Sequence, residues 1–284
     1  MKTIYTLFAF FGLITSNAQN KDVVITTHKV TDHIYMLEGR GGNIGVSSGE
    51  DGIFMIDSKF APLTPKILDA IKAISNKPIK FLANTHHHGD HTGGNENISK
   101  LNTSILAHDN VYKRIKNNSK QSDDALPIIT FNDKLSLYIN GDQVLIFHTE
   151  HAHTDGDALL YFTNSNVLHT GDTYFNGMYP YIDLNSGGSV NGYIAAAKQA
   201  LILIDDNTTI IPGHGKLSNK KEYEFFLEML ESIKVSVLKS IENGKTEDEV
   251  ASDASITKTY DDLNFGCCFI SSEKIRRTFY KSLK

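Results

Sequence analysis

Short apolar runs separated by turn residues recur in the first part of the chain, and this pattern predicts a series of short strands. The turn Gly49-Glu50-Asp51-Gly52 separates two of the apolar runs, so we expect neighbouring strands to pair antiparallel. The expected strands cover residues 23–30, 34–38, 43–47 and 52–56. Thr64 and Pro65 then predict a helix start, as N-cap and first helical residue. This helix leads to a short buried strand at 79–83.

The second part of the chain repeats this order of strands followed by helices. The expected strands cover residues 104–107, 134–139, 143–148, 158–162, 166–169 and 209–212, with a polar loop at 117–126. The expected helices cover 109–116, a segment capped by Ser189, an apolar stripe at 225–237, a capping box from Thr246 to Glu249, and the C-terminus. Two such halves favour an α/β fold of two packed sheets with helices outside.

The N-terminus is typical of a secretory signal peptide. Lys2 precedes an apolar run at 4–14, and small residues follow as far as Ala18. The apolar run is too short to span a bilayer comfortably, so we expect cleavage after Ala18. The mature chain, 19–284, is then expected in the periplasm or outside the cell, free of the membrane. We expect it to form one domain, with the helices from about 219 packed on it.

Composition and net charge indicate which classes of binding partner the protein can have. Hydrophobic residues make up 40 % of the chain and charged residues 21 %, as in an ordinary globular protein. The formal net charge of −5 becomes −6 when Lys2 is removed with the signal peptide. An acidic protein has no electrostatic attraction for nucleic acid, so we expect a small-molecule substrate. Cys267 and Cys268 are adjacent, and neighbouring cysteines pair poorly, so we expect partly buried thiols and no disulfide.

Potential metal-binding side chains are most concentrated in the segment His86-His87-His88-Gly89-Asp90-His91. This segment follows closely after the expected strand at 79–83. Side chains on a loop at the end of a strand can converge on one point outside the sheet. In an extended segment His86 and His88 face the same way and His87 faces the other. Asp90 and His91 lie where the chain turns, so they can address a second point. Such a set is costly to place unless it binds something, which favours a metal site over a solvated histidine tract.

Four motifs in one order resemble the metallo-β-lactamase superfamily. The first is His-x-His-x-Asp-His at 86–91, and the others are Ala152–Asp157, His169–Asp172 and Ile211–Gly215. The resemblance implies a four-layer αβ/βα sandwich with a metal site at one edge of the sheets.

The resemblance also implies seven ligands for two metal ions. The first ion takes His86, His88 and His153, the second takes Asp90, His91 and His214, and Asp172 bridges the two. Neutral imidazoles and carboxylates suit zinc, although iron and manganese occupy similar sites. Two zinc ions roughly 3.5–4 Å apart can share a hydroxide that attacks a carbonyl carbon. Asp90 is the expected catalytic residue, because it can orient that hydroxide and pass a proton to the leaving group.

Other polar and aromatic residues near these motifs each allow two interpretations. Asp57 either supports residues 86–91, the metal loop, through hydrogen bonds or is a simple turn residue. We expect His87, His148, His151 and His169 to be structural or to support the ligands indirectly. The aromatic segment 173–181 either lines the substrate site or packs under a helix, and its Asn176 is a weak candidate for contact with a developing oxyanion.

The motifs depart from those of the best-known broad-spectrum β-lactamases. Asp172 stands where those enzymes have cysteine, and Phe175 stands where they have a lysine that holds the substrate carboxylate. Asp172 resembles the arrangement of glyoxalase II and of lactonases, but the C-terminal helices show no basic cluster suited to glutathione. We therefore expect a dinuclear zinc hydrolase of a small ester, thioester, lactone or β-lactam. The alternatives are a mononuclear iron sulfur dioxygenase of the same fold and a non-catalytic metal-binding protein.

Overall fold

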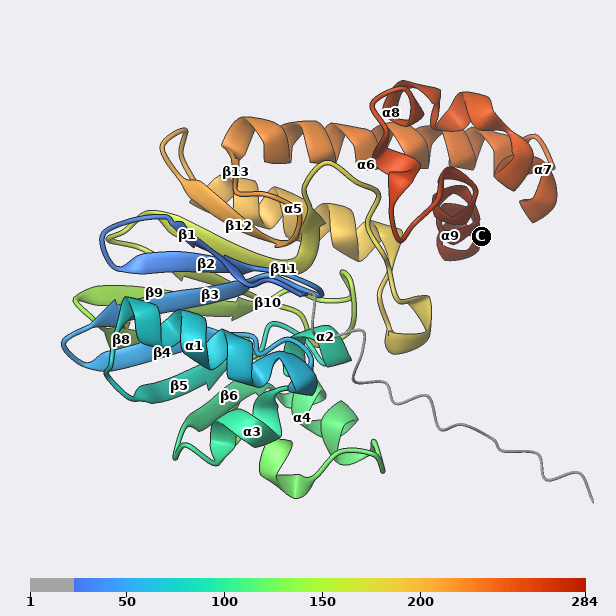
Figure 1. The fold of residues 1–284 in the computed structure, drawn as a ribbon. Helices are drawn as coiled ribbons and strands as arrows, with labels where there is room; N and C mark the ends of the chain where they lie inside the picture. The colour runs from blue at the N-terminus through green and yellow to red at the C-terminus, as the bar shows by residue number, and fades with distance from the viewer. Residues whose placement is uncertain (1–22) are drawn as a thin grey trace, which may run out of the picture.

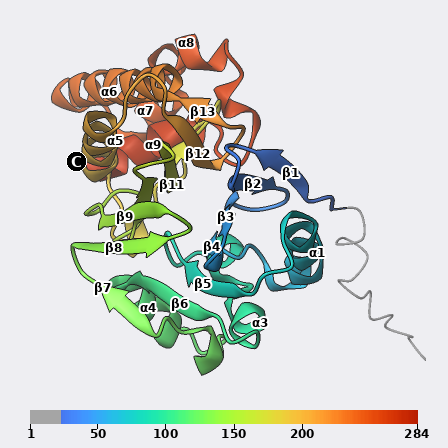
Figure 2. The same cartoon turned by 90° about the vertical axis from the view of Figure 1, so that its left-hand side faces the viewer.

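The computed structural model describes residues 23–284, and the expected signal peptide at 1–18 lies outside the described residues. Two β-sheets lie face to face, and helices cover the outer side of each sheet (Figure 1). Figure 2 shows the same layers from the side, with α5 and α6 on one sheet and α1, α3 and α4 on the other. This is the α/β four-layer sandwich that the sequence predicts.

The first sheet contains seven strands in chain order within the described residues. They are β1 (Thr26–Lys29), β2 (Ile34–Glu38), β3 (Ile44–Gly49), β4 (Gly52–Ile56), β5 (Ile79–Ala83), β6 (Ser104–His108) and β7 (Ile129–Phe131). Strands β1 to β4 pair antiparallel, whereas β4 to β7 pair parallel. The helices of this half are α1 (Thr64–Ile74), α2 (Gly89–Thr92), α3 (Asn95–Ser99) and α4 (Asp109–Lys116). The carboxyl ends of β5 and β6 therefore meet at one edge.

The second sheet contains six strands in the order β13-β12-β11-β10-β9-β8 within residues 23–284. They are β8 (Lys134–Ile139), β9 (Asp142–His148), β10 (Ala158–Phe162), β11 (Val167–Phe175), β12 (Thr209–His214) and β13 (Ser218–Asn219). The helix α5 (Val190–Leu203) joins β11 to the parallel strand β12. The ends of β11 and β12 consequently reach the same edge of the molecule as the end of β5.

The C-terminal helices lie on the outer side of the second sheet, next to α5. They are α6 (Lys220–Glu242), α7 (Glu247–Ser252), α8 (Lys258–Asp261) and α9 (Ser272–Leu283). Single 3-10 turns, labelled η2 (Ala61–Leu63), η3 (Asp123–Ala125), η4 (Leu184–Ser186), η5 (Ala254–Ile256) and η6 (Phe265–Cys267), join the longer elements. Among the described residues, we find no helix with the length and apolar character needed to cross a membrane.

Apolar side chains from both sheets form the central core. Met36 and Phe54 of the first sheet meet Leu160 and Phe162 of the second, and all four are buried. The Phe54 and Phe162 rings lie 6.1 Å apart between their centroids. Burying a side chain of this size stabilises a fold by about 1.5–3 kcal/mol, so this layer holds the two sheets in a common position.

Most expected elements agree with the structure, and three local expectations need correction. Thr64 is not the N-cap of α1: Leu63 is, without a side-chain hydrogen bond, and Thr64 is the first helical residue. Strand β11 continues to Phe175, so Asp172 lies within an irregular strand and not just beyond its end. The segment 117–126 is not wholly a loop, because it contains the turn η3.

The expectation for the two cysteines is wrong. Cys267 and Cys268 form a disulfide, and both are exposed. The backbone of Cys268 (φ −117°, ψ −136°) leaves both helical and strand geometry at the end of η6, and the two Cα atoms are 3.7 Å apart. This local conformation brings the neighbouring sulfur atoms together, and a sequence pattern does not reveal it.

Candidate metal centre

All seven predicted ligand side chains lie at one edge of the two sheets. His86, His88, Asp90 and His91 follow β5, on the loop that enters the short helix α2. His153 lies on the loop after β9, Asp172 lies within β11, and His214 ends β12. Four of the seven side chains therefore come from the first sheet and three from the second, and the packing of the sheets brings the two groups together.

Three imidazoles and one carboxylate form the first cluster, His86, His88, His153 and Asp172. His88 Nδ1 lies 2.9 Å from His153 Nε2. The Asp172 Oδ2 atom lies 3.8 Å from His86 Nε2 and 3.5 Å from His153 Nε2. The four side chains thus point their donor atoms at a common centre.

Asp90, His91 and His214 form the second cluster, and Asp172 borders it as well. Asp90 Oδ2 lies 3.4 Å from His214 Nε2 and 3.7 Å from His91 Nε2. Asp172 Oδ1 lies 3.0 Å from His91 Nε2, and its Oδ2 lies 3.3 Å from His214 Nε2. The Asp172 carboxylate therefore lies between the two clusters, within reach of ligand atoms of both.

Buried polar atoms without partners test whether these clusters suit metal ions. His86 Nε2, His91 Nε2 and Asp172 Oδ1 are all buried and lack a hydrogen-bond partner among the described residues. A buried polar atom without a partner is costly, and nearly all such atoms in proteins are satisfied. All three point into the clusters, and neutral imidazole and carboxylate are common ligands of divalent metals. The residues present therefore fit metal ions at both clusters.

Burial and charge divide the histidines into two groups. Burial lowers the pKa of His153 to about 4 and the pKa of His86 well below its usual value, so both imidazoles are neutral at pH 7. Burial opposes a charge on His214 too, but the Asp172 and Asp90 carboxylates outweigh it and raise the pKa of His214 to about 9. For Asp172, burial is outweighed by His214 and His91, which hold its pKa well below the usual range. The metal-free site thus balances carboxylates with imidazolium groups.

Asp57 supports the metal loop directly, so the simple-turn interpretation of this residue is wrong. Its buried carboxylate accepts hydrogen bonds from Thr85 N (2.8 Å) and Thr85 Oγ1 (2.7 Å), and lies 2.7 Å from His91 Nδ1. Its backbone has φ of 63°, a left-handed conformation that aspartate tolerates better than most residues. Asp57 accepts a hydrogen bond from the Nδ1–H group of His91, so the lone pair on His91 Nε2 points toward the cluster.

Two further acceptors orient ligands and escaped the sequence analysis. Asp183 Oδ2 lies 3.0 Å from His88 Nε2, which leaves His88 Nδ1 free to face the first cluster. The backbone carbonyl of Tyr181 lies 2.7 Å from His153 Nδ1. Asp183 is 95 residues from His88 in the chain, and its only local signal is that it caps η4. No sequence pattern links it to the metal loop.

Lys59 is a second residue that the sequence analysis missed. It is fully buried beside the site, and its ammonium group donates to the Gly42 carbonyl oxygen. Burial lowers its pKa to about 8, although Asp90 and Asp57 oppose this effect. A buried cation here offsets part of the negative charge of the two carboxylates. A lysine in a polar stretch of sequence gives no sign that it will be buried.

Gly213 explains why the last motif contains glycine. A Cβ atom at this position would collide with Asp172 Oδ1 and with the backbone of Gly171. Glycine therefore allows β12 to approach β11 where the Asp172 carboxylate turns toward the clusters.

The remaining histidines lie outside the two clusters. His148 stacks on His108 with ring centroids 3.8 Å apart, and His151 Nδ1 lies 2.8 Å from the Gly187 carbonyl oxygen. His169 is buried, and a Cβ atom at Gly45 of β3 would lie 3.0 Å from its ring. His87 lies beside His88 and Asp183 and belongs to neither cluster. These positions agree with structural or indirect roles.

The rings of the aromatic segment 173–181 divide between the core under the C-terminal helices and the neighbourhood of the predicted ligands. Tyr174 and Tyr179 are buried in the core under the C-terminal helices. Phe175 instead stacks on His214 at 4.8 Å, and the Tyr181 ring lies 5.8 Å from His88. The segment thus packs under the helices and also lines one side of the metal centre.

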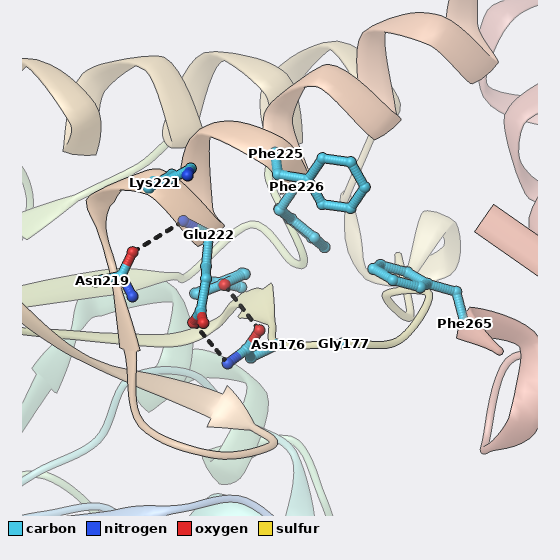
Figure 3. Close-up of a pocket in the computed structure, with 9 residues that line it drawn as sticks. Asn176, Gly177, Asn219, Lys221, Glu222, Phe225, Phe226 and Phe265 are labelled. Atoms are coloured by element: carbon cyan, nitrogen blue, oxygen red, sulfur yellow. Dashed lines mark hydrogen bonds between the residues drawn. The ribbon is translucent and has the colours of Figure 1, made fainter. Parts of the chain in front are cut away.

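Asn176 does not face the metal centre. Its amide nitrogen lies 3.3 Å from Glu222 Oε2 and 3.2 Å from the Lys216 carbonyl oxygen. Figure 3 shows it in a separate pocket, beside Glu222 and on the same side as Phe225 and Phe226. The volume of this pocket is about 510 Å³. The expectation that Asn176 contacts an oxyanion is therefore wrong, because its side chain lies on the helix side of β11.

Known proteins resemble the chain in both sequence and fold. Residues 37–214 match the family described as the Metallo-beta-lactamase superfamily. The chain is 24 % identical to the 2,4-dinitroanisole O-demethylase subunit alpha of Nocardioides sp., over 85 % of this chain and 73 % of that protein. It is 34 % identical to the hydroxyacylglutathione hydrolase of Nitrosococcus oceani, but over only half of either protein.

Solved structures with the same fold have lower sequence identity. A metallo-beta-lactamase from Pontibacter korlensis superposes with a TM-score of 0.65 at 17 % identity, over 73 % of this chain and 99 % of that one. The stereoselective inverting sec-alkylsulfatase Pisa1 from Pseudomonas sp. superposes with a TM-score of 0.73 at 17 % identity, over 91 % of this chain and half of that one. The family match covers more than half of the chain, so this protein belongs to the metallo-β-lactamase superfamily and is a metal-dependent hydrolase of that family.

Proposed function

We propose that the protein is an exported dinuclear zinc hydrolase that cleaves a small ester, thioester, lactone or β-lactam. The observation that carries the proposal is the Asp172 carboxylate, which lies 3.0 Å from His91 Nε2 and 3.5 Å from His153 Nε2. One carboxylate within reach of both clusters is suited to bridging two metal ions. The match to a hydroxyacylglutathione hydrolase supports transfer of an acyl group to water.

The proposed ligands are those that the sequence suggested. His86, His88 and His153 would hold one zinc ion, Asp90, His91 and His214 would hold the other, and Asp172 would lie within reach of both. When bound, the two ions supply Lewis-acid chemistry, because they make water nucleophilic near pH 7 and polarise the substrate carbonyl. Asp57 and Asp183 hold the ligand imidazoles in the tautomers that this chemistry needs.

Asp90 is the proposed catalytic carboxylate. Its pKa is about 2, because His91 and His214 outweigh the burial that would raise it, so it is ionised across the physiological range. An ionised carboxylate at this position can orient the attacking water, accept its proton, and hand that proton to the leaving group. The expected export of the mature chain fits a substrate met outside the cytoplasm.

The test combines metal content with hydrolysis by the purified mature chain. We expect about two zinc ions per chain and turnover of at least one of a chromogenic β-lactam, a lactone and a thioester. Asp90→Asn should lower kcat by roughly 10²–10⁴-fold, which is the usual size of a lost general base. Asp69→Asn, an exposed carboxylate on α1, is the matched control and should leave kcat unchanged.

Two results would contradict this proposal. One bound iron with oxygen uptake on a persulfide, and no hydrolysis, would favour the sulfur dioxygenase. Two bound zinc ions with no turnover of any of the three substrate classes would favour a non-catalytic metal-binding protein.

A further inference from the structure

A chain of aromatic rings leads outward from the metal centre to an exposed phenylalanine. The Tyr181 ring lies 5.8 Å from His88 and 5.7 Å from His153, between ring centroids. The Phe269 ring lies 5.7 Å from Tyr181, and 71 % of Phe269 is exposed. Phe269 is thus one ring away from two proposed ligands.

Lys274 joins the two outer rings. Its Nζ atom lies 4.6 Å from the Phe269 ring and 5.5 Å from the Tyr181 ring. These two rings are the observed partners of the Lys274 ammonium group. A cation over two aromatic faces attracts both, which holds Phe269 beside Tyr181 in place of free rotation in solvent.

The segment that carries Phe269 is anchored at both ends. The Tyr179 backbone N–H donates to the Phe265 carbonyl oxygen (3.1 Å), and Phe265 is buried. On the other side, Ile270 is buried and Ser272 Oγ donates to Asp261 (2.5 Å). The exposed residues between these anchors include the disulfide-bonded pair Cys267 and Cys268, directly before Phe269.

The disulfide limits the backbone where no buried contact does. Cys267 and Cys268 have no core partner to fix their dihedral angles, because both are exposed. A covalent ring through adjacent side chains removes backbone freedom at these two residues, and therefore limits where the next side chain can point. Disulfides persist in oxidising compartments, which agrees with the expected export of the chain.

We propose that Tyr181 and Phe269 form an apolar wall of the substrate site, that this wall selects substrates with a longer apolar acyl group, and that the Cys267–Cys268 disulfide positions it. The proposal rests on the proposed function, because it assigns the wall to the same hydrolytic centre. An external dithiol opens the bridge: the S–S bond breaks, Cys267 and Cys268 gain two electrons and two protons, and the dithiol becomes a disulfide. Substrate selection is then sensitive to the redox state of the two cysteines.

The first test does not need enzymatic activity. The chain contains no tryptophan, so Phe269→Trp places a single fluorescent reporter on the wall. We expect dithiothreitol to shift its emission to longer wavelength and to lower its anisotropy, as the indole leaves Tyr181 and Lys274. The same reporter in a Cys267→Ser/Cys268→Ser background should show the shifted emission from the start and no response to dithiothreitol. An emission spectrum that is the same with the bridge closed and open overturns the positioning role of the disulfide.

The second test measures selection as a ratio, so that it is independent of the fraction of metal-loaded enzyme. The ratio is kcat/KM for 4-nitrophenyl hexanoate divided by kcat/KM for 4-nitrophenyl acetate. Phe269→Ala should lower this ratio roughly tenfold, mainly through the KM of the hexanoate, because a partly apolar pocket discriminates added methylenes by about that factor. Leu263→Ala, another exposed apolar residue of the same region, should leave the ratio unchanged.

Opening the bridge should reproduce part of the Phe269→Ala effect. Dithiothreitol should lower the ratio for the natural sequence and leave it unchanged in Cys267→Ser/Cys268→Ser, which separates the disulfide from loss of metal to the reductant. An unchanged ratio in Phe269→Ala overturns the wall. If the enzyme hydrolyses neither of the two esters, the proposed function is contradicted for esters. The tryptophan reporter still decides in that case whether the disulfide positions residue 269.

Discussion

Single residues outside the predicted ligand set decide which nitrogen atom of three predicted ligand histidines faces the metal centre. Three histidines each form a hydrogen bond through the nitrogen atom that faces away from the centre. Asp57 binds Nδ1 of His91, and Asp183 binds Nε2 of His88. The Tyr181 carbonyl oxygen binds Nδ1 of His153. An imidazole whose other nitrogen is engaged has a fixed tautomer and a fixed ring orientation. The orientation of these three predicted ligands therefore depends on acceptors outside the predicted ligand set.

Asp57→Asn should weaken metal binding by about 10–100-fold. The neutral amide keeps the size of the side chain but loses the charge that orients His91, and it offers an N–H group where Thr85 already donates. Competition with a chromophoric zinc chelator measures the affinity. Asp69→Asn on the exposed side of α1 serves as the control. An affinity equal to that of the natural chain would show that the contact does not support the ligand.

Zinc affinity should rise with pH between pH 7 and pH 8 by about tenfold or more. Burial opposes protonation of His214, but Asp172 and Asp90 raise its pKa to about 9, so zinc must displace a proton from it at pH 7. The same raised pKa stabilises the metal-free fold below pH 6.5, and this contribution is lost as the pH rises through about 9. Chelator competition at several pH values, corrected for the chelator's own protons, measures the slope. A flat profile would refute proton displacement.

Whole elements bring the ligands to one edge through their connections. Helix α5 begins at the cap Ser189, whose Oγ accepts a hydrogen bond from Gly192 N (3.0 Å) and donates to the His151 carbonyl oxygen (2.9 Å). The Ser189 backbone N–H also donates to the Ala152 carbonyl oxygen (3.0 Å). The start of α5 is thereby tied to the loop that presents His153.

Ser189→Ala should lower the free energy of unfolding by about 1 kcal/mol or slightly more. The substitution leaves the first turn of α5 with an unpaired N–H group and removes its bond to the His151 carbonyl. Urea unfolding followed by circular dichroism measures the change. Ser271→Ala removes the corresponding N-cap of α9 and should lower the free energy of unfolding while leaving the zinc affinity unchanged. Ser189→Ala should also weaken zinc binding measurably. Equal zinc affinities in the two variants would contradict a link between α5 and the metal centre.

At the scale of the whole molecule, the metal centre depends on how the two sheets pack. The first sheet supplies His86, His88, Asp90 and His91, and the second supplies His153, Asp172 and His214. A change in the position of one sheet relative to the other would separate the two halves of each cluster. The apolar layer around Phe54 and Phe162 is what holds that position.

Phe162→Ala should lower the free energy of unfolding by about 3–5 kcal/mol, because it opens a cavity between the sheets. Phe162 is 1 % exposed and contacts Phe54 of the other sheet. We also expect weaker zinc binding, although the residue belongs to the core and not to the site. Thermal unfolding with and without zinc measures both effects. Ile202→Ala, at a position that is 84 % exposed, should change neither, and a similar loss in that variant would argue against the cavity as the cause.

Patterns that are local in the chain predicted a large part of this protein. Apolar runs bounded by turn residues located most strands within one or two residues, because strands of the central core are buried and the chain must turn between them. Ser189 and the pair Thr246 and Glu249 marked helix starts, because unpaired N–H groups need nearby acceptors. The segment 86–91 by itself predicted a metal site, because four potential metal ligands lie on this one loop.

Contacts between distant segments were decided only by the tertiary structure. The pairing of Asp183 with His88, the burial of Lys59 and the turning of Asn176 toward Glu222 all depend on which elements pack together. The disulfide between Cys267 and Cys268 depends on one backbone conformation that no residue pattern specifies. The sequence thus determined the elements and the chemical types at the site, because both follow from short-range rules. Packing decided which acceptor orients each ligand and which rings border the centre, because those partners lie tens of residues apart.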